Sequence, residues 1–129
     1  MIAIESINKK QNFISGIFKT KAKADKAFQK IIEKEKFHFV EYNNIQIPFF
    51  IIEKENKFKY YQNKNEVLTE IKKIKVVNEK DEDISYCTLY FIKDEHINKN
   101  PEQDSMGSLD HLHIDNDSLK RIDELFSTF

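Results

Sequence analysis

The chain has 129 residues, of which 40% are hydrophobic and 33% are charged, and its formal net charge is −1 at pH 7. This length suits one domain with a buried core, and the balance of 21 basic and 22 acidic residues argues against wholesale disorder. With two Gly and two Pro, the composition also excludes collagen-like and other fibrous architectures. We therefore expect a single domain over residues 1–129.

Three features predict a cytoplasmic protein with no membrane partner. The single cysteine, Cys87, cannot form an internal disulfide, which is typical of a reducing compartment. No apolar run approaches the roughly 20 residues that a membrane-spanning helix needs. Residues 1–10 lack the apolar segment and the small-residue cleavage site of a secretory signal.

Charge is distributed unevenly along the chain. Residues 1–80 carry 17 Lys against 10 acidic residues, a net charge of +7. Residues 81–129 carry 4 basic against 12 acidic residues, a net charge of −8. Such asymmetry indicates either a charged partner or two halves that attract each other within one fold, and the sequence is compatible with both.

The chain begins with two short predicted strands and a helix. The strands cover residues 2–7 and 13–18, and Gly16 in the second strand indicates a bulge or close packing. Thr20 is a good N-cap for a helix over residues 21–36. Apolar residues at helical spacing form the expected buried stripe of this helix: Ala24, Ala27, Phe28, Ile31 and Ile32.

Residues 45–61 carry the strongest β signal, a hairpin of two strands. Both faces of the first strand, residues 45–53, are apolar. Pro48 places this strand at a sheet edge or beside a bulge, because proline lacks the N–H that a ladder needs. Glu55 and Asn56 form the predicted turn, since Asn tolerates the left-handed backbone of tight hairpin turns.

A second helix and the most hydrophobic strand follow. Asn65 is the expected N-cap of a helix over residues 66–75, in which apolar residues recur at helical spacing. Residues 84–92 have apolar side chains on both faces, which is typical of a central strand. We expect Phe28 and Ile31 of the first helix to pack against the sheet that contains this strand.

The last third of the chain begins with the longest predicted loop, residues 93–108. A short strand over residues 111–114 comes next, and Asp117 caps a final helix that begins at Ser118. Strands separated by single helices predict an α+β fold: a mixed, mostly antiparallel sheet with about three helices packed mainly on one face.

A pair of histidines forms the best candidate metal site. Because His111 and His113 lie two residues apart on a strand, both side chains point to the same face and can share a Zn²⁺. The third ligand would be His96, Asp104 or Asp115. No known metal-site spacing supports this set, and the alternative is an exposed strand face. We expect no metal site and no cofactor.

The sequence contains no recognisable catalytic motif. Cys87 lies in an apolar strand with no cation nearby, so we expect a buried, unreactive thiol. Ser105 and Ser108 lack the glycine pattern of a nucleophile elbow. Residues 57–61 mix lysine with aromatic residues, but no nucleic-acid module accompanies them. We expect a protein that is not an enzyme and has no nucleic-acid partner.

The chain resembles the small cytoplasmic immunity proteins of bacterial toxin–immunity systems, including contact-dependent growth inhibition. The resemblance rests on its size, its α+β pattern, the missing catalytic motifs and the acidic C-terminal half. The resemblance is a profile over the whole chain without a diagnostic motif, so it transfers no functional residue. It implies binding to a cognate toxin domain, often a basic nuclease, so that its active site is covered.

An acidic surface suits such a partner through electrostatic complementarity. The expected partner-binding residues are the carboxylates that follow residue 80: Asp81, Glu82, Asp83, Asp94, Glu95, Glu102, Asp104 and Asp110.

Two other classes of function stay open. One is a small metal-dependent or hydrolytic enzyme centred on His111 and His113. The other is a homo-oligomeric structural or regulatory protein, a homodimer in the simplest case, joined through the apolar strand at residues 48–52. The upstream gene discriminates between them, because a large secreted protein with a variable C-terminal domain favours immunity and a metabolic operon favours an enzyme.

Overall fold

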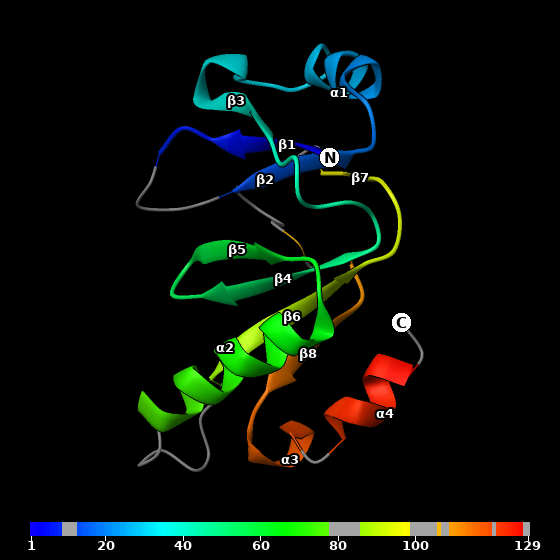
Figure 1. Ribbon diagram of the computed structural model, residues 1–129. Helices are drawn as coiled ribbons and strands as arrows, with labels where there is room; N and C mark the ends of the chain where they lie inside the picture. The colour runs from blue at the N-terminus through cyan, green and yellow to red at the C-terminus, as the bar shows by residue number, and fades with distance from the viewer. Residues whose placement is uncertain (9–12, 78–85, 99–105, 107–108, 120, 128–129) are drawn as a thin grey trace.

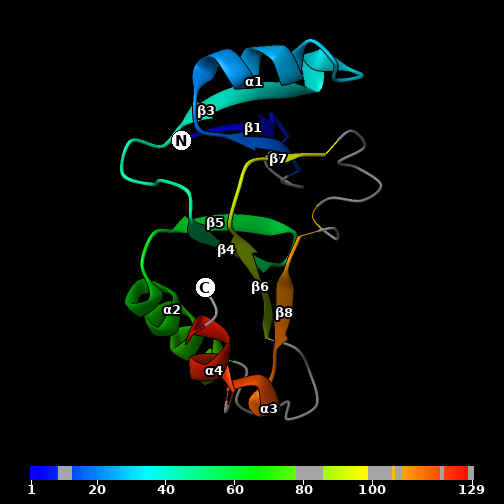
Figure 2. The same cartoon turned by 90° about the vertical axis from the view of Figure 1, so that its right-hand side faces the viewer.

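The structure is a computed structural model that describes residues 1–8, 13–77, 86–98, 106, 109–119 and 121–127. Within these residues, eight strands form two four-stranded antiparallel sheets that pack face to face (Figure 1). A quarter turn shows the same order of layers: helix α1, the first sheet, the second sheet, then helices α2 and α4 (Figure 2). Helices therefore cover the outer face of each sheet.

The first sheet has the strand order β3-β1-β2-β7. Its strands are β1 (Ile2–Ser6), β2 (Ile14–Phe18), β3 (Phe37–Glu41) and β7 (His96–Ile97). The helix α1 (Lys21–Phe28) lies on its outer face, and a short 3-10 helix, η1 (Lys34–Lys36), leads into β3. Apolar side chains of β1, β2 and β3 pack against Ala24 and Ala27 of α1.

The second sheet has the strand order β5-β4-β6-β8. Its strands are β4 (Phe49–Lys54), β5 (Lys57–Tyr61), β6 (Cys87–Ile92) and β8 (His111–Ile114). The helices α2 (Lys64–Val77) and α4 (Ile122–Ser127) cover its outer face, and α3 (Asn116–Leu119) lies between β8 and α4. None of the helices described here is both long enough and apolar enough to cross a membrane.

Alternation along β4 explains its two apolar faces. Phe49 and Ile51 are buried between the two sheets, whereas Phe50 and Ile52 are buried against α2 and α4. The predicted burial of both faces is confirmed. The predicted edge position is wrong, because β4 pairs with β5 on one side and with β6 on the other. Pro48 precedes the first residue of β4 and so removes no hydrogen bond from the ladder.

The predicted hairpin turn and the predicted cap of the first helix are confirmed. Glu55 and Asn56 have φ of 53° and 62°, as a tight hairpin turn requires. The Thr20 hydroxyl accepts a hydrogen bond from the backbone N–H of Lys23 at 3.3 Å. The second helix begins at Lys64, so the predicted N-cap at Asn65 is wrong. The helix keeps the predicted stripe of Val67, Leu68, Ile71 and Ile74 toward the core.

The C-terminal helical region is capped at Asp115 and not at Asp117 as predicted. The Asp115 carboxylate accepts from the Ser118 N–H at 2.8 Å, and the Ser118 hydroxyl accepts from the Asp115 N–H at 2.7 Å. This reciprocal pair is a capping box, which starts α3 at Asn116. Ile122 and Phe126 of α4 are buried as expected, and the region is two short helices where one was predicted.

The first helix is shorter than predicted and packs on a different sheet. It ends at Phe28, because Lys30 and Ile31 donate backbone hydrogen bonds three residues back and Glu33 takes a left-handed conformation. The chain then enters β3, which pairs with β1. Phe28 and Ile31 therefore pack on the first sheet, so their predicted contact with the sheet of residues 84–92 is wrong.

Gly16 marks both a bulge and a close approach, as predicted. Ile4 pairs with Gly16 and Glu5 with Ile14, so Ser15 is the extra residue of a β-bulge. A Cβ atom at Gly16 would lie within 2.6 Å of the Phe18 ring. The missing side chain therefore lets that ring lie across β2.

The predicted α+β class and antiparallel pairing are confirmed. The strands divide into two sheets because β3 and β7, which the sequence analysis missed, complete a second layer. Their short lengths and interrupted apolar patterns explain the omission. The predicted loop over residues 93–108 contains β7, and Met106 from the same segment is buried between the sheets.

Candidate functional site

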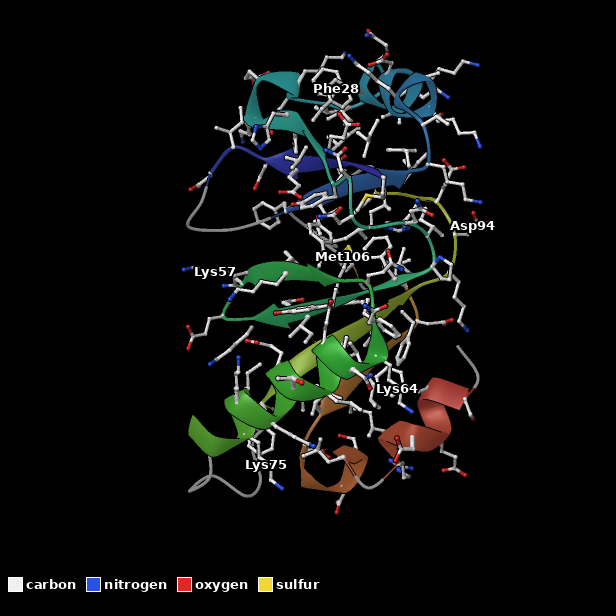
Figure 3. All side chains as sticks on the ribbon, in the orientation of Figure 1. Phe28, Lys57, Lys64, Lys75, Asp94 and Met106 are labelled. Atoms are coloured by element: carbon white, nitrogen blue, oxygen red, sulfur yellow. The ribbon has the colours of Figure 1, made fainter. Side chains whose placement is uncertain are left out.

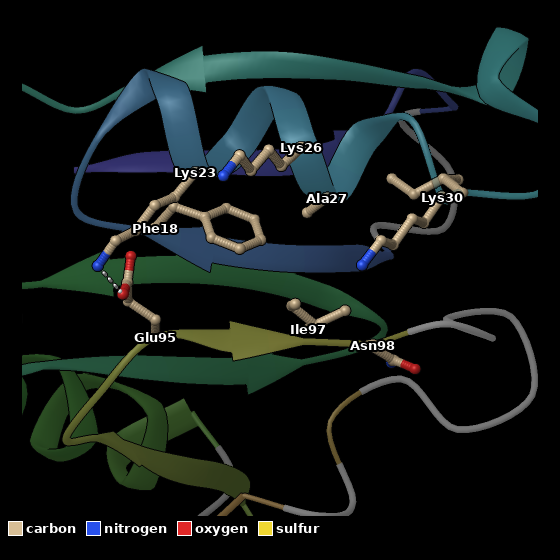
Figure 4. Close-up of a pocket in the computed structure, with 9 residues that line it drawn as sticks. Phe18, Lys23, Lys26, Ala27, Lys30, Glu95, Ile97 and Asn98 are labelled. Carbon is tan, nitrogen blue, oxygen red and sulfur yellow. Dashed lines mark hydrogen bonds and ion pairs between the residues drawn. The ribbon is translucent and has the colours of Figure 1, made fainter.

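A cavity of about 540 Å³ opens between α1 and β7 (Figure 4). We call it the α1–β7 groove. Its floor is apolar and consists of Phe18, Ala27, Ile31 and Ile97. Its rim carries Lys23, Lys26 and Lys30 on the helix side, and Glu95 and Asn98 on the strand side. The groove thus places exposed apolar surface next to several charges.

Two local features of the chain keep this floor open. The helix α1 is buried through Ala24 and Ala27 against the first sheet, and β7 extends that sheet by one short strand at its edge. Ile97 of β7 pairs with Gly16, and its side chain is 55% exposed. Exposed apolar side chains become informative when they belong to a concave patch with a polar rim.

The charges on the rim are partly paired. The Glu95 carboxylate accepts hydrogen bonds from the Lys19 backbone N–H at 2.9 Å and from the Lys23 ammonium at 2.8 Å. The hydrogen bond to Lys23, followed by the one from Lys19, lowers the pKa of Glu95, and the same Glu95 carboxylate raises the pKa of Lys23. Glu95 is therefore held ionised at neutral pH.

Lys26 and Lys30 complete the rim without a counter-charge. Within the part of the chain that the structure describes, neither forms an ion pair with a carboxylate. With Lys23 neutralised by Glu95, the groove carries the positive charge of these two lysines above its apolar floor. It can therefore attract a negatively charged group that also offers apolar surface.

Three of the predicted partner-binding carboxylates lie in described segments, and each lies beside a lysine. Glu95 belongs to the groove, and Asp94 lies 3.8 Å from the Lys19 ammonium near the groove's end. Asp110 lies 3.2 Å from the Lys93 ammonium, next to the second sheet. The other five predicted residues lie outside the described residues: Asp81, Glu82, Asp83, Glu102 and Asp104.

Some of the charge asymmetry along the sequence is used within the fold. The ion pairs Lys19–Asp94, Lys23–Glu95 and Lys64–Asp123 each join a lysine before residue 80 to a carboxylate after it. The structure thus favours, for these residues, attraction between the two halves of the chain. Among the described residues it leaves Lys26 and Lys30 of the groove without an ion pair.

The two histidines share an exposed face of β8, as predicted, with ring centroids 5.4 Å apart. The proposed third ligands do not join them: His96 lies in the first sheet, the Asp115 carboxylate caps α3, and Asp104 lies outside the described residues. Among the residues placed by the structure, no group of three or more His, Cys, Asp or Glu side chains can hold a metal ion.

Cys87 is buried in β6, as predicted. Burial raises the pKa of its thiol to about 12, so the thiol stays protonated and is a poor nucleophile at neutral pH.

The apolar strand on which the homo-oligomer alternative depends is not exposed. Phe49, Phe50, Ile51 and Ile52 are buried, and β4 is paired with β5 on one side and β6 on the other.

A polar cluster that sequence reasoning missed joins the two sheets. The Glu5 carboxylate accepts hydrogen bonds from the Tyr42 hydroxyl at 2.6 Å and from the Tyr60 hydroxyl at 2.7 Å. Burial, and secondarily the Glu5 carboxylate, raises the pKa of both hydroxyls, so they remain donors. Tyr60, from the segment of mixed lysine and aromatic residues at 57–61, thus points into the protein.

The groove itself was also missed by the sequence analysis. Its lysines are visible as the polar side of an amphipathic helix, which usually indicates a solvated surface. Ile97 lies in a segment predicted to be a loop. Their proximity depends on the pairing of β7 with β2, which links residues about 80 positions apart. A comparison of the chain with protein-family models, curated proteins and solved structures finds no match.

Proposed function

We propose that the protein is an immunity protein that binds a toxin domain in the cytoplasm and docks it in the α1–β7 groove. The observation that carries this proposal is the apolar floor, with Ile97 55% exposed, beneath Lys26 and Lys30, which form no ion pair with any described carboxylate. Protein interfaces combine an apolar centre with a polar rim in the same way.

The chemistry of the groove supports binding in preference to catalysis. Its titratable side chains are lysines and Glu95, and Glu95 is held ionised by two hydrogen bonds. A general acid at neutral pH needs a raised carboxyl pKa, whereas that of Glu95 is lowered. The groove therefore offers burial and charge to a partner, with no proton donor tuned for catalysis among its described side chains.

Co-expression with the C-terminal domain encoded by the gene upstream tests the proposal. The wild-type protein is expected to restore growth and to co-purify with that domain. The double variant Lys26→Glu/Lys30→Glu is expected to weaken binding by about tenfold or more, because two favourable rim charges become unfavourable. Growth rescue and affinity of the purified pair are the two readouts.

A matched control separates groove charge from total charge. Lys57→Glu/Lys59→Glu makes the same change in net charge on the exposed side of β5, away from the groove. It is expected to leave rescue and affinity unchanged. Failure of the wild-type protein to protect against the upstream domain would end the immunity proposal, and equal loss in both double variants would remove the groove from it.

A further inference from the structure

We infer that the groove accepts an acidic, apolar segment of its protein partner, and that Glu95 occupies the place of one partner carboxylate in the free protein. This inference rests on the proposed function, because it names the chemistry of the partner at the same site. It reverses the sign of the interaction expected from the sequence, in which acidic residues of this chain meet a basic toxin.

Glu95 shows how the groove holds a carboxylate. Its oxygens accept hydrogen bonds from the Lys19 backbone N–H at 2.9 Å and from the Lys23 ammonium at 2.8 Å. Figure 4 shows the second of these contacts. One fixed donor and one flexible cation make an oriented, charge-assisted site. A partner carboxylate that reaches Lys23 would compete with Glu95 for the same ammonium.

Lys26 and Lys30 supply two further positions for negative charge. Lys26 lies in α1 and Lys30 lies two residues beyond its end, and both side chains line the helix side of the groove. Because no described carboxylate pairs with either of them, binding an acidic segment here breaks no existing ion pair of theirs.

The floor selects for apolar side chains between those charges. Phe18 and Ile31 are buried at the base, and Ile97 is exposed at the edge of the sheet. Covering Ile97 removes apolar surface from water, which a purely acidic segment cannot do. The complementary segment therefore alternates carboxylates with apolar residues.

The inference gives Glu95→Gln an unusual expected effect. The amide oxygen of glutamine can still accept the N–H of Lys19, but the negative charge that neutralises Lys23 is gone. An acidic segment should then bind more tightly. If Glu95 instead contacted a basic partner directly, the same substitution would weaken binding.

The test uses the full-length protein and a short synthetic peptide in which Glu and Leu alternate, with a Lys-Leu peptide and a Glu-Ser peptide as probes of charge and apolar surface. Amide NMR shifts are followed during titration. The Glu-Leu peptide is expected to shift the amide signals of α1 and β7. Lys26→Glu/Lys30→Glu should weaken the affinity for this peptide about tenfold, and Glu95→Gln should strengthen it about threefold. Asp94→Asn, an equal charge change at a residue that does not line the groove, should have a smaller effect than Glu95→Gln.

Any of four results would overturn the inference. The Lys-Leu peptide or the Glu-Ser peptide could bind as tightly as the Glu-Leu peptide, the shifted amide signals could lie away from α1 and β7, or Glu95→Gln could bind the Glu-Leu peptide more weakly. Retained amide dispersion in each variant shows that the fold is intact. If the toxin domain is neutralised but the Glu-Leu peptide does not bind, the proposed function stands and this inference fails. If the peptide binds but no toxin is neutralised, the groove chemistry stands and the immunity proposal fails.

Discussion

Gly16 shows how one residue shapes the groove. With no side chain at this position, the Phe18 ring can lie across β2 and form part of the floor. The adjacent bulge turns the Ser15 hydroxyl toward the Asn98 carbonyl, to which it donates at 3.0 Å, so β2 is tied to the chain after β7. The sequence predicted a bulge or close packing at Gly16, but the ring that approaches it depends on tertiary packing.

Gly16→Ala is expected to destabilise the protein by about 1–3 kcal/mol, because the added methyl group overpacks this site. It would lie within 2.6 Å of the Phe18 ring and 3.2 Å from the His96 carbonyl oxygen. Urea unfolding measures the change. In a Phe18→Leu background the cost of Gly16→Ala should be smaller, and an equal cost in both backgrounds would show that the ring is not the cause.

Two weakly acidic side chains with raised pKa values, the buried Cys87 and the partly buried Tyr61, predict a loss of stability in alkali. Burial raises the pKa of Cys87 from 9.0 to about 12, and burial also raises that of Tyr61 from 10.0 to about 12. Above pH 9 the unfolded chain releases these protons while the folded protein keeps them, so the unfolded state is favoured as pH rises. The contribution of these two groups to the free energy of unfolding is present below pH 9 and declines toward pH 12.

Unfolding by urea across pH 8 to pH 12 tests this expectation, with a slope of at most about 1.4 kcal/mol per pH unit from Cys87 and a smaller slope from the more exposed Tyr61, whose charge is screened by solvent. Cys87→Ala removes one such group and should make the decline shallower. A wild-type stability that does not change between pH 9 and pH 12 would contradict the assignment.

At the scale of elements, the sequence predicted the features that depend on neighbouring residues and missed the features that depend on pairing between distant strands. The apolar alternation of β4, the turn at Glu55 and Asn56, and the buried stripe of α2 follow from neighbouring residues, and they are confirmed. The end of α1 does not, because residues 29–36 contain no glycine or proline. Pairing of β3 with β1 overrides the helical spacing there.

The layer between the two sheets should contribute more to stability than the contacts of α1. Phe49 is fully buried in that layer, so Phe49→Ala is expected to cost about 3–5 kcal/mol. Phe28 is partly buried beside Phe39, at 4.9 Å between ring centroids, and Phe28→Ala should cost clearly less. Equal losses in chemical denaturation would contradict this arrangement of layers.

At the scale of the whole molecule, charge is concentrated around α1. Residues 19–36 carry seven lysines and three carboxylates, a net charge of +4, and this segment forms one outer layer of the protein (Figure 3). The sequence predicted the asymmetry but assigned the binding surface to the acidic half. The described carboxylates Asp94, Glu95 and Asp110 each lie beside a lysine, and that proximity could not be read from their positions in the chain.

The most direct test of the account is amide hydrogen exchange of the full-length protein, alone and in complex with the toxin domain that it neutralises. Docking in the groove predicts slower exchange in residues 20–31 and 96–98, with Lys57→Glu/Lys59→Glu leaving this pattern unchanged. Protection confined to β8, or to the acidic segments after residue 80 outside the groove, would contradict the claim that the α1–β7 groove is the docking surface.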